Sequence, residues 1–98
     1  MLNIALSLYG QTFATRERAR ELLETIDQSA SADEEPCVDL TGVVASPSFM
    51  AEFLNQLAVR HVSIAVTGGS DYLQSLTENL VERLGLSGRV RMNHGAAL

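Results

Sequence analysis

The sequence predicts an α/β fold: a two-layer sandwich in which a mixed or parallel sheet of three to four strands carries three helices on one face. Two observations lead to this fold class. A segment with strand character is followed by a segment with helical spacing of apolar residues, three times in succession. Each predicted strand also has large apolar residues on one face only, whereas helices on both faces would require apolar residues on both. The length of 98 residues suits one domain with one core, covering residues 1–98.

The first predicted strand covers residues 2–9, where large apolar residues alternate with small or polar ones. Gly10 ends this strand. Thr15 is a suitable N-cap for an amphipathic helix over about residues 16–28, because apolar positions recur there at helical spacing. The polar stretch 29–36 has no periodicity and predicts a surface loop.

The second strand is predicted over residues 37–40 and is closed by Thr41 and Gly42. Ser46 and Pro47 then start the second helix. A serine can cap free backbone N–H groups, and a proline at the first helical position has no N–H to leave unbonded. This pair is a strong start signal for a helix.

The third strand is predicted over residues 62–66, and Ser70 or Asp71 caps the helix that follows. Gly85 ends that helix, and residues 89–92 predict an added edge strand. The apolar side of the third helix is predicted to carry Leu73, Leu76, Leu80 and Leu84. The order is therefore βαβαβα, which favours parallel pairing with right-handed crossovers.

The strand residues divide by size into two faces. The large residues are Leu2, Ile4, Leu6, Leu8, Val38, Leu40, Val62, Ile64 and Val66. The small or polar residues are Asn3, Ala5, Ser7, Cys37, Asp39, Ser63 and Ala65. We expect the helices to cover the first face, and the second face to be solvated or covered by something flat.

Charge and composition exclude several classes of function. The net charge of −5 and the isoelectric point of about 4.8 predict no nucleic-acid partner and no membrane partner, because phosphate backbones and anionic lipids attract basic surfaces. No apolar run approaches the roughly 20 residues of a membrane span, and the first residues lack the features of a secretory signal. The single cysteine, Cys37, suits a reducing compartment, so we expect a cytoplasmic protein.

Four residues near the ends of the second strand and the start of the second helix are candidate functional residues. Ser46 and Ser48 are candidate phospho-acceptors, because free N–H groups and the helix dipole favour a phosphate in the first turn. Capping alone also explains such serines. Thr41 lies in the turn at the same end of the sheet. Asp39 ends the strand, either as a structural tie to the neighbouring loop or as part of a binding surface.

The sequence predicts no enzyme site. His61 and His94 have no second ligand at metal spacing, and Cys37 has no histidine near it in the sequence. No nucleophile and base pair can be assembled from these residues. We therefore expect no catalytic residues, no metal and no cofactor.

The segment Val38-Asp-Leu-Thr-Gly-Val43, followed by Ser46-Pro-Ser-Phe-Met-Ala-Glu-Phe-Leu54, resembles the central motif of STAS domains, the fold of anti-sigma factor antagonists. It is more similar to the STAS-like family of prokaryotic domains, in which Ser-x-Ser-Phe opens the second helix and an acidic residue follows, as Glu52 does here. Residues 15–23 are similar to that family's first helix. The resemblance runs over roughly residues 2–84. The Asp-Ser-Ser-Gly of phosphorylatable antagonists does not stand at the helix start.

The resemblance implies a non-enzymatic regulatory module that binds another protein around the start of the second helix and that serine phosphorylation could control. By analogy the partner is a histidine-kinase-like ATPase or an anti-sigma-like factor. The alternative is a structural or self-assembling subunit, such as a homodimer through the small-residue face of the sheet, without phosphoregulation.

Overall fold

The computed structural model describes residues 2–29 and 35–93, in which strands and helices alternate along the chain. The main elements are β1 (Leu2–Ala5), α1 (Arg16–Ser29), β3 (Pro36–Asp39), α2 (Pro47–Arg60), β5 (Ile64–Thr67), α3 (Asp71–Arg83) and β6 (Val90–Asn93). Three short elements lie between them: a 3-10 turn, η1 (Leu6–Leu8), and the two-residue strands β2 (Thr12–Phe13) and β4 (Val44–Ala45).

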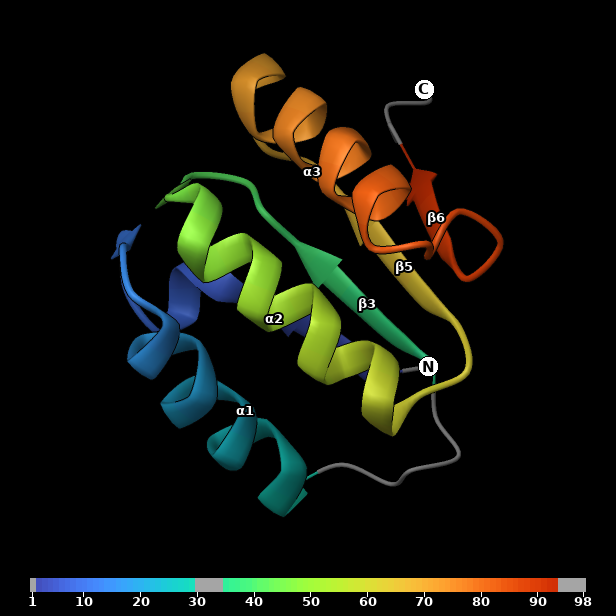
Figure 1. Cartoon of the computed structure of the whole chain (residues 1–98). Coiled ribbons are helices and arrows are strands. Elements are labelled where there is room, and N and C mark those ends of the chain that lie inside the picture. Colours follow the sequence, from blue (N-terminus) through green and yellow to red (C-terminus); the bar gives the residue numbers. More distant parts are fainter. Residues whose placement is uncertain (1, 30–34, 94–98) are drawn as a thin grey trace.

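The four longer strands form one parallel sheet in the order β1-β3-β5-β6. Each helical connection therefore moves one strand further in the same direction. Right-handed connections that always step the same way place every helix on the same face of the sheet. Figure 1 shows this arrangement, with α2 between α1 and α3 and all three helices on one side. The predicted two-layer α/β sandwich is confirmed, with a fully parallel sheet and three helices on one face.

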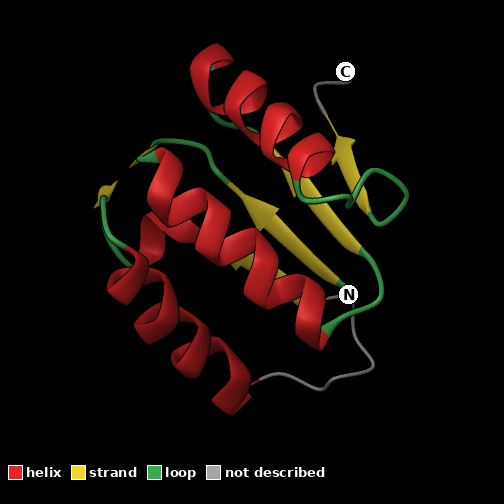
Figure 2. Cartoon of the chain, viewed as in Figure 1, coloured by secondary structure: helices red, strands yellow, loops and turns green. Residues whose placement is uncertain are grey.

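The strand register separates the two faces of the sheet, as the size pattern predicted. Ile4, Val38 and Val66 lie in one row across the sheet and are buried beneath the helices. The neighbouring rows point away from the helices. We call this side the open face; it carries Asn3, Ala5, Cys37, Asp39, Ala65, Thr67 and Arg91. Figure 2 shows the helices together on the opposite side.

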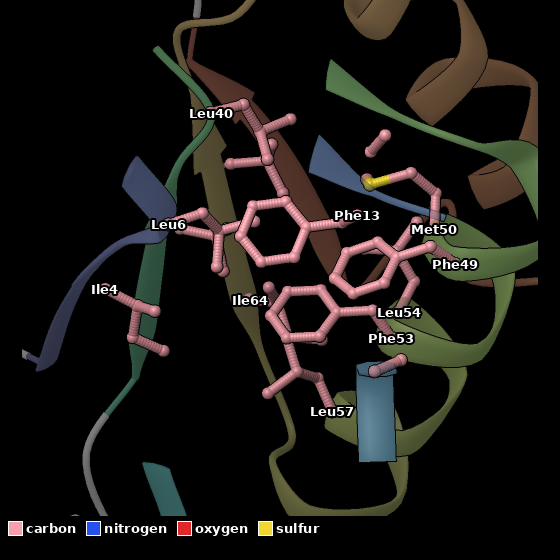
Figure 3. Close-up of a cluster of buried hydrophobic side chains, with 14 of the residues drawn as sticks. Ile4, Leu6, Phe13, Leu40, Phe49, Met50, Phe53, Leu54, Leu57 and Ile64 are labelled. Atoms are coloured by element: carbon pink, nitrogen blue, oxygen red, sulfur yellow. The ribbon is translucent and has the colours of Figure 1, made fainter. Parts of the chain in front are cut away.

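Aromatic residues fill the centre of the core between α2 and the sheet. The ring of Phe49 lies 5.0 Å from that of Phe13 and 5.4 Å from that of Phe53, centroid to centroid. All three rings are fully buried, with Leu6 and Leu40 near them (Figure 3). Phe13 comes from β2, so the short strand anchors the segment before α1 in the core.

Several local predictions were wrong. The first strand ends at Ala5, because Ala5 pairs with Asp39, the last residue of β3, and no partner strand continues beyond it in the described chain. The chain turns at once into η1, which leaves Leu8 81% exposed rather than in the core. Val62 is 84% exposed, because β5 begins only at Ile64.

The third helix departs from the sequence prediction in one detail, whereas the strand predicted after it is present. Leu84 lies just past the end of α3 and is partly exposed, whereas Thr77 and Val81 are buried. The hydroxyl of Thr77 is satisfied within the helix, since it donates to the carbonyl of Leu73 at 2.7 Å. The predicted edge strand is present as β6, displaced by one residue from the expected range.

The pairing of β2 with β4 was not predicted, because two-residue strands are too short for an alternating pattern to show. Thr12 pairs with Val44, and Phe13 with Ala45, in parallel. None of the helices in the two described ranges has the length and hydropathy to cross a membrane.

Candidate functional site

The candidate residues lie along one edge of the sheet, which we call the carboxyl edge. In a parallel βα arrangement the strands end, and the following helices begin, at the same edge. β3 and β5 end here, and α2 and α3 begin here, at the upper left of Figure 1. Loops at this edge are where open α/β sheets commonly bind their ligands.

Asp39 and Thr41 form a tight turn against the loop that follows β5. A carboxylate oxygen of Asp39, Oδ1, accepts a hydrogen bond from the backbone N–H of Thr41 at 2.9 Å. Gly68 lies directly against this turn with a φ of +72°. A Cβ atom there would lie 2.3 Å from Thr41 Oγ1 and 2.6 Å from Asp39 Oδ1. Asp39 therefore serves as a structural tie in a turn that requires glycine beside it.

Ser46 is the N-cap of α2, and its hydroxyl is fully engaged. Its oxygen accepts a hydrogen bond from the N–H of Phe49 at 3.1 Å and donates to the carbonyl of Ala14 at 2.8 Å. The backbone N–H of Ser46 also donates to the carbonyl of Phe13 at 2.9 Å. Ser46 thus joins the start of α2 to the segment before α1, and a phosphate attached to its oxygen would remove the proton that it donates to Ala14.

Ser48 lies in the first turn of α2, and its side chain is exposed to solvent. The structure therefore separates two serines that the sequence offered equally as phospho-acceptors. Ser46 holds the helix start in place, whereas Ser48 is accessible to another molecule.

Two exposed apolar side chains accompany these polar groups. Val44 in β4 is 65% exposed, and Tyr72 in the first turn of α3 is 60% exposed. A Cβ atom at Gly69 would lie 3.0 Å from the Cβ of Leu40, so the segment that follows β3 packs against the loop that precedes α3. We call the exposed residues of these elements the edge surface: Thr41, Val44, Ser48, Asp71 and Tyr72.

Sequence reasoning did not find Val44 and Tyr72 as site residues. Val44 belongs to a strand that leaves no periodic pattern. For Tyr72 a signal exists, because it lies outside the apolar positions of α3 that begin at Leu73. A large apolar residue off the buried side of a helix is the pattern that could have identified it.

Other charged side chains join separate elements of the fold. The guanidinium of Arg18 donates to the carbonyl of Tyr9 at 2.6 Å and lies over the ring of Phe13. Arg20 pairs with Glu52 at 3.3 Å, which joins α1 to α2. These contacts assign Glu52, the acidic residue of the second-helix motif, to helix packing.

The opposite edge of the sheet, the amino edge, is organised by Arg89. This guanidinium donates to the carbonyls of Ala58, His61 and Val62 at the end of α2. It thereby satisfies carbonyls that a helix end leaves without partners and places a positive charge at the negative end of the helix dipole. On the open face, Arg91 pairs with Glu35.

The described residues contain no group of three or more histidine, cysteine, aspartate or glutamate side chains that could hold a metal ion. A depression on α3 is lined by Asn79, Glu82 and Arg83. It lies toward the far end of that helix and shares no residue with the edge surface.

The fold and its edge define a small α/β domain that presents loops and two helix starts along one side of a parallel sheet. Comparisons of the chain with protein-family models, with curated proteins and with solved structures returned no match. The STAS-like resemblance of residues 2–84 stays an expectation from the sequence, so the function is argued from the site.

Proposed function

We propose that this chain is a non-enzymatic regulatory module that binds another protein through the edge surface. The observation that carries the proposal is that the apolar side chains of Val44 and Tyr72 and the polar residues Thr41 and Ser48 are all exposed in elements at the carboxyl edge. Aromatic and aliphatic side chains framed by polar groups are typical of protein interfaces. Two of the four candidate residues, Asp39 and Ser46, support this surface from beneath through their hydrogen bonds.

Ser48 is the position at which phosphorylation would act. A phosphate there would be exposed, would lie near the positive end of the α2 dipole, and would leave the cap formed by Ser46 intact. By the resemblance, the partner would be a histidine-kinase-like ATPase or an anti-sigma-like factor. We expect the module to work in the cytoplasm, where the lone thiol of Cys37 stays reduced.

The replacement Ser48→Asp tests this function. An acidic residue in the first helical turn stabilises the helix by about 0.3–1 kcal/mol, so the variant should melt no lower than wild type. Immobilised wild type and variant are compared for the amounts of individual proteins that they retain from a lysate of the source organism, measured by quantitative mass spectrometry.

Ser75→Asp, an exposed change in the middle of α3, is the matched control for added charge. The proposal predicts that Ser48→Asp changes the retention of a specific protein at least tenfold while Ser75→Asp does not. Equal retention by all three forms would mean that this surface is not the binding site.

A second candidate function is homodimer formation through the open face. The supporting observation is that no described helix covers this face, whereas parallel sheets are usually covered on both. Small residues such as Ala5, Cys37 and Ala65 would allow close packing. Ala5→Arg should then dissociate the dimer in sedimentation equilibrium, and Asn55→Arg on the exposed side of α2 should not.

A further inference from the structure

We infer that Arg16 binds a phosphate carried by Ser48 of the same chain, so that phosphorylation closes an ion pair between the start of α1 and the start of α2. The inference rests on the proposed function, since it takes Ser48 as the phosphorylated residue and assigns the group that receives the phosphate. It is carried by a register that continues from the pairing of β2 with β4 into the two helices that follow these strands.

The segments that lead into α1 and α2 are paired at a constant separation of 32 residues along the chain. The pairs in this register are Thr12 with Val44, Phe13 with Ala45, Ala14 with Ser46, and Arg20 with Glu52. The first two pairs are strand partners, the third is a hydrogen bond of 2.8 Å, and the fourth is an ion pair of 3.3 Å. The two helices therefore start together and run side by side in the same direction (Figure 1).

Arg16 and Ser48 share this register and lie between two of the observed pairs. They come two residues after the hydrogen-bonded pair and four residues before Arg20 and Glu52. Residues four apart lie on the same face of a helix, so Arg16 and Ser48 face each other as the ion pair does, one turn earlier. A phosphate on Ser48 would thus repeat, nearer the carboxyl edge, the bridge that Glu52 already makes to α1.

Arg16 is the arginine of α1 whose position the unmodified fold does not explain. Arg18 donates to a backbone carbonyl and lies over an aromatic ring, and Arg20 pairs with Glu52. The guanidinium of Arg16 is exposed and has no hydrogen bond or ion pair to another residue of the ranges 2–29 and 35–93. Arg16 is also the first residue of α1, where a positive charge is unfavourable beside the positive end of the helix dipole. An anion opposite Arg16 would offset this cost.

Ser48 can accept a phosphate without loss of the helix start, because its side chain is exposed and the hydroxyl of Ser46 caps α2. The donor would be a nucleoside triphosphate bound to a protein kinase. The oxygen of Ser48 forms a bond to the γ-phosphorus, the bond from that phosphorus to the nucleoside diphosphate breaks, and the hydroxyl proton passes to a base of the kinase. The product carries a charge of about −1.5 to −2, of which Arg16 neutralises one unit. The two states of the edge therefore differ in the position of an arginine as well as in net charge.

Phosphorus NMR of the protein with phosphoserine encoded genetically at position 48 tests the inference. Arg16 should hold the second pKa of this phosphate below its value in the same protein with Arg16→Gln, because a nearby positive charge favours the dianion. Glu17, Arg20 and Glu52, the neighbouring charged groups on α1 and α2, are unchanged in every protein compared, and so is the α2 dipole. Arg83→Gln at the far end of α3 removes an equal charge at a distance and should leave the pKa where it is.

Thermal unfolding before and after phosphatase treatment gives an independent measurement. Phosphorylation should raise the melting temperature by at least about 2 °C, and Arg16→Gln should remove about half or more of that rise. A phosphate whose pKa and effect on melting are the same with arginine and with glutamine at position 16 would overturn the inference. Equal effects of Arg16→Gln and Arg83→Gln would also overturn it, because the phosphate would then respond only to net charge.

The same proteins separate this inference from the proposed function. If residue 16 has no effect on the phosphate while Ser48→Asp still changes the retention of a specific protein, the inference fails and the proposed function stands. If Arg16 binds the phosphate while Ser48→Asp leaves retention unchanged, the inference stands and the proposed function fails.

Discussion

Gly68 gives the sharpest test of how the edge surface is built. Alanine at this position would hold a φ of +72°, a conformation that costs a residue with a Cβ about 1–2 kcal/mol. Its Cβ would also displace the Asp39 carboxylate, since it would lie only 2.6 Å from Oδ1. Moving that carboxylate breaks its hydrogen bond to Thr41, which contributes about 0.5–1.5 kcal/mol. Gly68→Ala should therefore destabilise the domain by about 1.5–3.5 kcal/mol.

Gly42 is the matched control, because its φ of +79° is similar but a Cβ added there would meet no described atom of another segment within 4 Å. Gly42→Ala should destabilise the domain only through the unfavourable positive φ, by about 1–2 kcal/mol. Thermal unfolding followed by circular dichroism measures both variants, and 1 kcal/mol corresponds to roughly 4–8 °C in a domain of this size. Gly68→Ala should melt at least about 2 °C below Gly42→Ala. Equal melting temperatures would refute the close approach of the two loops.

Three further predictions concern stability and can be measured by urea unfolding. Ser46→Ala should cost about 1–2 kcal/mol through the lost cap, whereas Ser48→Ala should stay within about 0.5 kcal/mol; the reverse order would contradict the assigned roles. Arg89→Met should cost about 2–3 kcal/mol, because it leaves carbonyls at the end of α2 without a charged donor; a neutral result would show that water replaces it. Phe13→Ala removes a ring from the centre of the core and should lower the free energy of unfolding by about 3–5 kcal/mol. Tyr72→Ala on the exposed edge should lower it by less than about 1 kcal/mol. Similar losses for the two variants would mean that the Tyr72 side chain is packed against the fold.

The layer arrangement could be predicted because it depends on patterns that repeat along the chain. The size asymmetry of three strands indicated helices on one face, and Ser46 with Pro47 and Ser70 marked two helix starts that the structure confirms by their hydrogen bonds. These signals are local and each rests on a few neighbouring residues.

The wrong or missing predictions concern features that are determined by contacts between segments far apart in the sequence. The exposure of Leu8 and Val62 depends on where the partner strands end, which no local pattern records. The role of Arg89 depends on carbonyls 27 to 31 residues earlier in the chain. Likewise, the sequence could not separate Ser46 from Ser48 as phospho-acceptors, because the hydrogen bond that commits the Ser46 hydroxyl proton reaches back to Ala14.

Site-specific photo-crosslinking in cells of the source organism tests the central claim most directly. A photoreactive phenylalanine analogue replaces Val44 on the edge surface or, as the control, Asn79 on the exposed part of α3. The account predicts that position 44 forms a covalent adduct with a second, different protein and that position 79 does not. Adducts of equal yield from both positions, or adducts from position 44 that contain only this chain, would contradict a partner-binding role for the carboxyl edge.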